Sequence, residues 1–298
     1  MKKVLLVVLI LALSATPLLF AACSSVSQRD LLTTGYVCSK GGYEYFAYDV
    51  FKADDEGYYT IPVGTMTMKF EPKEDAIVTL PDAGAEGGER SVEHFTGTLL
   101  STDVTMDNGD TILSRVIYDS GCVPTYSYKR TFIGGVTKEM QVSYEEKYLY
   151  ADRYEEGSKV SSVEHKKANC YDNESLYAVV RASSVSASSY TLTFTAVNPL
   201  TGSVDGMTIS KEGTMDNTVA ILTPSEYTLP EGKEKYTTPT YVFSIATDNQ
   251  YASKYYMEVT ESAQTVKNET INIKNVKKII TSIIEGQYKY VLTDVKIV

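Results

Sequence analysis

Along many short stretches of this chain, apolar and polar residues alternate strictly, which is the pattern of a half-buried β-strand. Residues 63–70 place three large apolar side chains on one face and two threonines and a lysine on the other: Met66, Met68 and Phe70. Residues 190–197 repeat this pattern, with threonines between three apolar residues: Leu192, Phe194 and Ala196. One apolar face and one polar face are typical of an antiparallel sheet that covers a core.

Clusters of acidic residues, asparagine and glycine separate these stretches and predict tight turns. They lie at residues 54–57, 107–110 and 155–158. In the second cluster, Asn-Gly supplies the positive φ angles that a tight hairpin needs. Two further segments, 81–88 and 223–239, are rich in glycine, proline and charge, and we expect both to be exposed loops. The order is then roughly eight strands, one helix and several more strands.

One segment breaks the alternation and predicts a helix of about ten residues. Asp172 or Asn173 can cap its start by accepting hydrogen bonds from free backbone N–H groups. Leu176, Val179 and Val180 follow at the spacing of a single helical face, so they form one apolar stripe. We expect this stripe to pack toward the sheet and toward any hollow that lies between sheet and helix.

The C-terminal region adds one ambiguous element and one clear element. Residues 275–285 have apolar side chains at helical spacing, but their β-branched content favours a strand almost as strongly. Residues 288–298 predict a last strand that ties the C-terminus into the sheet. Because long antiparallel sheets curl and must bury one face, we predict a mainly β fold. Its expected architecture is a large curved antiparallel sheet wrapping one short helix, with residues 42–298 as a single domain.

The helical segment also carries a family resemblance. Residues 171–181 read Tyr-Asp-Asn-Glu-Ser-Leu-Tyr-Ala-Val-Val-Arg. This is similar, by residue type and not by identical spacing, to the Asp-x-x-Ser-x-x-Tyr-x-x-Arg helix of domain-of-unknown-function family 3108, a group of exported bacterial proteins. The tyrosine-rich hairpins and the closing Tyr-Lys-Tyr-Val-Leu strand also resemble that family. The resemblance runs from about Tyr43 to the end, and it implies the open half-barrel of lipoprotein carriers such as LolA and LppX. Those carriers hold acyl chains in an apolar hollow.

The first residues have the parts of a secretory signal. A short basic start precedes an apolar run at residues 4–13, which is shorter than the ~20 residues that cross a bilayer. Ala21 and Ala22 then stand directly before Cys23, which resembles a bacterial lipobox with Phe20 where leucine is usual. We predict a lipoprotein signal peptide over residues 1–22, acylation of Cys23 and a flexible polar tether over residues 23–41.

Two other interpretations of this N-terminus stay open. One is an ordinary secretory signal that is cleaved near Ala22 without lipid attachment. The other is a transmembrane helix, which Ser14, Thr16 and Pro17 disfavour because they interrupt the apolar stretch. The remaining part of the chain has no other apolar stretch of spanning length.

Charge and cysteine content narrow the possible partners. The formal net charge is −10 at pH 7, and it becomes about −12 once Lys2 and Lys3 leave with the signal. Nucleic-acid binding needs clustered lysine and arginine, so no nucleic-acid partner is expected. Besides Cys23, three cysteines allow at most one internal disulfide, and their spacing matches no metal site: Cys38, Cys122 and Cys170.

No catalytic constellation stands out in the sequence. His94 and His165 lie far apart in polar strand ends, and no Gly-x-Ser-x-Gly motif or phosphate-binding loop occurs. The acidic segment 103–110 faintly resembles a calcium loop, but it lacks the glycine and the bidentate glutamate that such a loop needs. We therefore expect no catalytic residues, no cofactor and no bound metal.

The expected function is that of a non-enzymatic envelope lipoprotein. Acylated Cys23 would hold it in membrane lipid, at the outer leaflet of the cell membrane or in the outer membrane, while the β domain binds or carries an apolar or amphipathic ligand. The 24 tyrosines can line such a site or simply suit half-buried strands. The alternatives are a structural or adhesion module that binds protein or glycan through its sheet face, and an envelope hydrolase. No protein partner is indicated.

Overall fold

The structure, a computed structural model, describes most of the chain after residue 41. The described residues are 42–83, 88–121, 123–166, 170–182, 191–199, 201–220, 235–248, 255–260, 267–268, 271–272 and 278–297. The predicted signal peptide, Cys23 and the tether lie outside these ranges, as do Cys38 and Cys122. The predicted boundaries after residues 22 and 41 therefore stay predictions.

Fifteen strands form one sheet. Its first wall holds β1 (Glu44–Ala53), β2 (Tyr59–Pro81), β3 (Glu89–Met106), β4 (Thr111–Asp119), β5 (Pro124–Ile133), β6 (Val136–Tyr144), β7 (Tyr148–Glu155) and β8 (Ser158–Lys166). Its second wall holds β9 (Cys170–Asp172), β10 (Thr191–Val197), β11 (Val204–Ala220), β12 (Lys235–Thr247), β13 (Tyr255–Thr260), β16 (Ile280–Glu285) and β17 (Tyr288–Ile297). The helix α3 (Ser175–Ala182) follows β9, and β14 (Lys267–Asn268) pairs separately with β15 (Ile271–Asn272).

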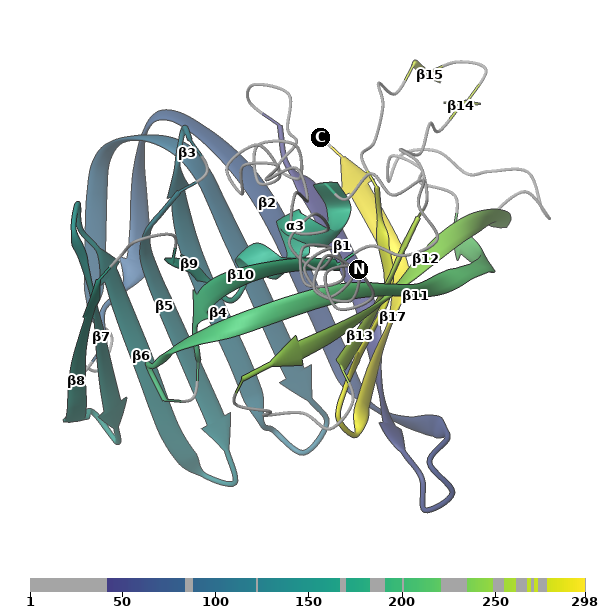
Figure 1. Ribbon diagram of the computed structural model, residues 1–298, viewed down its shortest axis with the longest axis horizontal. Coiled ribbons are helices and arrows are strands. Elements are labelled where there is room, and N and C mark those ends of the chain that lie inside the picture. Colours follow the sequence, from purple (N-terminus) through teal and green to yellow (C-terminus); the bar gives the residue numbers. More distant parts are fainter. Residues whose placement is uncertain are drawn as a thin grey trace, which may run out of the picture.

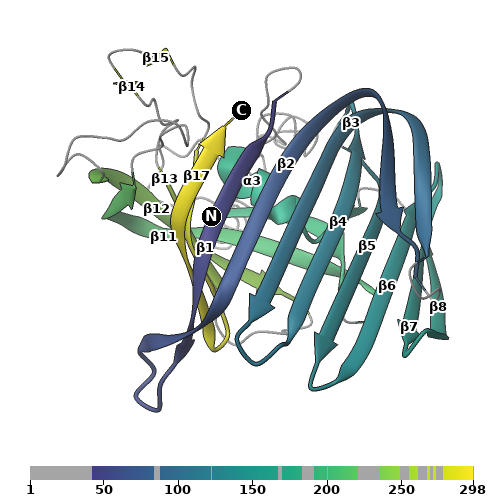
Figure 2. The ribbon, with the colours of Figure 1, turned by 180° about the vertical axis from the view of Figure 1, so that it is seen from behind.

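The sheet curls so that its two walls face each other with α3 between them (Figure 1). The first wall is a meander in chain order, as the view from behind shows (Figure 2). In the middle of the sheet, β1 pairs antiparallel with β17, and every other neighbouring pair is also antiparallel except β9–β10. The predicted mainly β fold, a large curved antiparallel sheet with one short helix, is confirmed for the described residues.

The longest hairpin bends sharply and packs against the outside of its own wall. The register of β2 and β3 shifts near residues 73–76, where Asp75 and His94 have positive φ angles of 48° and 52°. Such bulges bend a strand and increase its twist. At Gly97, a Cβ atom would lie 2.0 Å from the backbone oxygen of Tyr118, so only glycine allows the approach of β4 there. Beyond the bend, side chains of β2 and β3 pack with residues of β4 and β5 in a second cluster: Val78, Leu80, Phe95, Ile117, Tyr126 and Tyr128.

The main core fills the space between the walls, and the predicted alternation decides which side chains enter it. Met66, Met68 and Phe70 are buried, as are Phe194 and Ala196, while the partly buried Leu192 packs against them. The stripe of α3 belongs to the same core, at exposed fractions of 4% or less: Leu176, Val179 and Val180. Burial of these faces drives the folding of the sheet around the helix.

The structure corrects the expected elements in three places. Among the described residues, nine strands precede α3 where about eight were expected. The additional strand is β9, whose three residues are too few to show alternation in the sequence. Residues 280–285 form strand β16, so the helical alternative is wrong there. Residues 235–239 belong to β12 and not to a loop, and residues 221–234 lie outside the described part. Pro239 is tolerated because β13 pairs with β12 only from Thr240 onward, which leaves β12 an edge at the proline. No helix among the described residues is long and apolar enough to span a bilayer.

Candidate ligand-binding cavity

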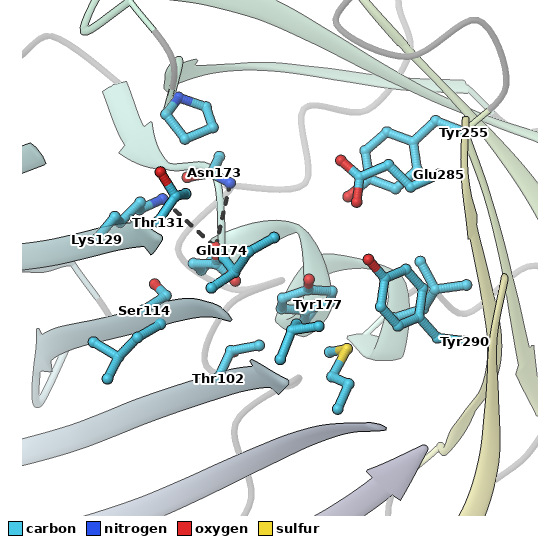
Figure 3. A pocket seen from close by; sticks show the side chains of 16 residues that line it. Thr102, Ser114, Lys129, Thr131, Asn173, Glu174, Tyr177, Tyr255, Glu285 and Tyr290 are labelled. Carbon is cyan, nitrogen blue, oxygen red and sulfur yellow. Dashed lines mark hydrogen bonds and ion pairs between the residues drawn. The ribbon is translucent and has the colours of Figure 1, made fainter. Parts of the chain in front are cut away.

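A cavity of about 270 Å³ lies between α3 and strands of both walls (Figure 3). Its apolar lining includes Met66 from β2, Val104 from β3 and Ile283 from β16. The polar lining consists of hydroxyl, amide, ammonium and carboxyl groups: Thr102, Ser114, Lys129, Thr131, Asn173, Glu174 and Glu285. Three tyrosines complete it: Tyr177, Tyr255 and Tyr290. An apolar pocket with a few converging polar groups is the usual form of a small-molecule site.

Two hydroxyl groups enter the cavity from neighbouring strands. Thr102 on β3 and Ser114 on β4 stand opposite each other in the ladder, and their exposed fractions are 6% and 4%. Both occupy inward positions that large apolar residues fill elsewhere along these strands. Neither side-chain oxygen has a hydrogen-bond partner among the described residues. Buried polar groups are nearly always paired, so these two oxygens need an explanation.

Asp172 fixes the start of the helix and one side of the cavity. The carboxylate is fully buried; its Oδ1 accepts from Lys129 Nζ at 2.8 Å and from the Glu174 backbone N–H at 3.1 Å. Its Oδ2 accepts from the Tyr144 hydroxyl at 2.9 Å. Burial by itself raises the pKa of Asp172, but the Lys129 ammonium and the hydrogen bonds outweigh it and hold that pKa below its usual value. Asp172, one of the two predicted caps, thereby joins β5 and β6 of the first wall to β9 and α3.

Glu174, two residues after Asp172, places a carboxyl group in the cavity lining. Its Oε1 lies 3.6 Å from Lys129 Nζ and accepts from Asn173 Nδ2 at 3.4 Å (Figure 3). The other oxygen, Oε2, and the amide oxygen of Asn173 have no hydrogen-bond partner among the described residues. Glu174 is 8% exposed, and burial raises its pKa. Four residues of the cavity lining thus carry a buried side-chain oxygen without a hydrogen-bond partner among the described residues: Thr102, Ser114, Asn173 and Glu174.

Glu285, the last residue of β16, brings another carboxyl group to the cavity lining from the second wall (Figure 3). Its burial against the walls raises its pKa to about 7, and the negative charge of Glu174 adds to the shift. Tyr290 lies on the neighbouring strand, and burial raises the pKa of its hydroxyl. The cavity lining therefore holds one ammonium group and two carboxyl groups in a partly desolvated space.

Comparison with known proteins adds little to this geometry. No family model and no curated protein matches the chain. Among solved structures, it is similar to a crystal structure described as a β-barrel-like protein of domain of unknown function DUF1849 from Brucella abortus. The identity is 11%, the match covers 86% of this chain and 98% of that chain, and the TM-score is 0.46. A similarity at this level carries no argument about ligand or activity, so the resemblance to family 3108 and to LolA-type carriers stays a prediction.

The residues that the sequence singled out lie in different parts of the structure. Leu176, Val179 and Val180 are buried in the main core, and the helical region reaches the cavity through Asn173, Glu174 and Tyr177 instead. Cys23 lies outside the described residues. Cys170 is a buried thiol, whose pKa burial raises to about 12.

The histidines and the acidic segment do not converge on the cavity. The His94 side chain is 84% exposed and contacts Asp75 at 2.6 Å, while His165 lies on β8. Residues 107–110 form the predicted hairpin turn, with Asn108 bonded to Asp110. Within the described ranges, no group of three histidine, cysteine or acidic side chains is placed to hold a metal ion.

Replacing Glu285 with glutamine should stabilise the protein at pH 8 and change its stability little at pH 4.5. The unfolded glutamate has a pKa of about 4.3, and the folded one has a pKa of about 7. Between these values the folded state keeps a proton that the unfolded state loses, so wild-type stability falls as pH rises toward 7. Because Glu285 is half-buried, solvent screens part of its charge, and the effect is smaller than the full pKa difference implies. We expect glutamine to raise the free energy of unfolding at pH 8 by about 2–3 kcal/mol.

Urea unfolding of the wild type and Glu285→Gln at both pH values measures this difference. Glu146→Gln, at an exposed turn position, is the matched control and should show no pH-dependent gain. An equal gain for Glu285→Gln at pH 4.5 and pH 8 would mean that packing, and not charge burial, explains the effect.

Proposed function

We propose that this protein is a non-enzymatic binding protein of the bacterial cell envelope that takes an apolar or amphipathic molecule into the cavity between its sheet and α3. The observation that carries the proposal is the mixed lining of that cavity. Met66, Val104 and Ile283 offer an apolar surface. Beside them stand buried oxygens without a partner, and leaving such a group unpaired costs about 1–3 kcal/mol. A ligand that pairs these oxygens removes that cost. If it also covers the apolar surface, it removes the cost of exposing that surface to water.

The size of the cavity limits the ligand. About 270 Å³ corresponds to roughly nine water molecules at about 30 Å³ each. The part of the ligand that enters should therefore have about that number of non-hydrogen atoms. Thr131, Tyr255 and Glu285 are half-buried lining residues and keep the cavity in contact with solvent. A longer molecule can then leave its remaining part outside.

The place in the envelope rests on the N-terminal sequence alone. In this proposal residues 1–22 are removed, lipid on Cys23 anchors the protein, and the tether carries the cavity above the outer leaflet of the cell membrane or at the outer membrane. A stable anchor needs more than one acyl chain, and a lipidated N-terminal cysteine supplies them.

The alternative functions draw less support from the described residues. A hydrolase would need a nucleophile and a base in one cleft, and neither histidine lines the cavity. A protein- or glycan-binding face would be marked by a continuous exposed apolar patch. The large exposed apolar side chains stand instead on several different strands and turns: Tyr58, Ile61, Ile77, Ile133, Val136, Tyr148, Val160 and Met215.

Solvent extraction of the purified full chain, followed by mass spectrometry, tests the proposal. We expect an apolar or amphipathic compound to co-purify with the wild type. The cavity-filling variant Ser114→Phe should carry about tenfold less, because one aromatic ring takes most of the volume. Ser158→Phe, at the exposed first residue of β8, is the control and should carry as much as the wild type. A wild type that yields no such compound and takes up no added 1-octanol would overturn the proposal.

A further inference from the structure

Each of the unpaired side-chain oxygens in the cavity lining can accept a hydrogen bond. The Oε2 of Glu174 and the Oδ1 of Asn173 can only accept, and neither has a partner among the described residues. The hydroxyl oxygens of Thr102 and Ser114 can accept as well. Glu174 is more than nine-tenths buried and is one of the residues that line the cavity.

The charges around the cavity are also unbalanced. Lys129 is the cation of the lining, and its ammonium is already bound by the buried Asp172 at 2.8 Å. The carboxyl groups of Glu174 and Glu285 then remain, with only a longer contact of 3.6 Å from Lys129 to Glu174. Two partly desolvated carboxyl groups of like charge disfavour each other's ionised form. A bound cation would relieve this and would supply donors at the same time.

We infer that the ligand carries a primary ammonium group, held between the carboxyl groups of Glu174 and Glu285, with its apolar part against Met66, Val104 and Ile283. This inference rests on the proposed function and names the chemistry of its ligand. An ammonium offers three donors and no acceptor, which matches the acceptors on the cavity wall. It is compact, so it leaves most of the roughly nine-atom space for an alkyl portion.

The binding of such a head should depend on pH through Glu285. The titratable and charged groups around it come from β5, the residue before α3, the helix itself, β13 and β17: Lys129, Glu174, Tyr177, Tyr255, Tyr288 and Tyr290. Burial keeps Tyr290 neutral, since its pKa is raised, whereas Glu285 ionises near pH 7. An alkylammonium keeps its charge up to about pH 10, like a lysine side chain. Affinity should therefore rise with pH as Glu285 loses its proton.

Calorimetric titration of the full chain with three probes of equal chain length tests the inference: octylamine, 1-octanol and octanoate. At pH 8 we expect octylamine to bind about tenfold more tightly than 1-octanol, the effect of one charge-assisted hydrogen-bonded contact. Octanoate should bind most weakly. At pH 5.5 the preference for the amine should shrink severalfold. Glu285→Gln should abolish most of the preference for octylamine over 1-octanol and the pH dependence of that preference, and the exposed Glu146→Gln should change neither.

The possible failures are distinguishable. Equal affinities for octylamine and 1-octanol at pH 8, or tightest binding of octanoate, would overturn the ammonium inference while leaving the binding function in place. A preference for the amine that survives in Glu285→Gln would overturn the role of that carboxyl group. If none of the three probes binds, the proposed function fails and the inference fails with it.

Discussion

Replacing Arg181 with methionine should lower the free energy of unfolding by about 3–5 kcal/mol. Arg181 is 2% exposed; its Nη2 donates to Glu44 Oε2 at 2.6 Å, and its Nε donates to the backbone oxygen of Lys278 at 2.8 Å. Without the guanidinium, Glu44, itself 2% exposed, becomes a buried carboxylate that has lost its counter-ion. Desolvation of that charge is the main source of the expected loss.

The surroundings of Arg181 make the substitution informative. Its guanidinium carbon lies 5.1 Å from the ring centroid of Phe46 and 4.8 Å from that of Phe70, so it is held between β1, β2 and the end of α3. Methionine preserves much of the volume and the apolar contact with these rings. The measured loss therefore reports on the charge and hydrogen bonds more than on packing.

Urea unfolding gives the value, with two comparisons. Lys138→Met removes a half-exposed pair, with Glu155 at 3.5 Å, and should cost no more than about 1 kcal/mol. The double variant Glu44→Leu/Arg181→Met should be more stable than Arg181→Met alone, because no lone charge stays buried. If Arg181→Met costs no more than Lys138→Met, or if the double variant is the least stable of all, the buried pair does not have the role assigned to it.

Replacing Asp172 with alanine should also cost about 3–5 kcal/mol at pH 7. The change leaves the ammonium of Lys129 buried beside Glu174 alone, takes the acceptor from the Tyr144 hydroxyl and removes the cap from the backbone N–H of Glu174. The cap by itself is worth about 1 kcal/mol, so most of the loss comes from the unpaired charge.

The loss should depend on pH in a stated direction. Since the pKa of Asp172 is lowered in the folded protein, its stabilising effect is complete above the unfolded value of about 3.9. It disappears as pH falls through the folded pKa. Unfolding of the wild type and Asp172→Ala from pH 7 downward should show the two stabilities converging in acid. Asp172→Asn, which keeps the shape but not the charge, should lie between them. A constant difference at all pH values would contradict the assigned role of the carboxylate.

The sequence predicted the elements of this fold better than their arrangement. Alternation at residues 63–70 identified the inward side chains of β2, and the Asn-Gly turn identified the β3–β4 hairpin. These signals are local, so one stretch of chain is enough to show them. The pairing of β1 with β17 and the parallel β9–β10 pair are contacts between distant segments, and no local pattern specifies them.

The candidate site escaped prediction for a related reason. The helix stripe was the expected lining, but the cavity takes its charges from Lys129, Glu174 and Glu285 on three separate elements. One signal was present for Lys129: in β5, Ser127, Lys129 and Thr131 share a face, which is polar where most inward positions of the neighbouring strands are apolar. For Glu285 the sequence contains no such signal, because a charged residue after an apolar run is usual at the end of a strand. Its burial arises only when the two walls come together.

The position of β1 between β2 and β17 limits the order in which the strands of the sheet can pair. Residues 44–53 of β1 have two neighbours, β2 beside them in the chain and β17 at residues 288–297. Synthesis delivers the chain from its N-terminus, so β1 lacks one of its two neighbours until residues 288–297 have been made. Pairings between such distant segments also form slowly. The apolar side chains between the walls therefore stay incompletely covered until β17 pairs with β1.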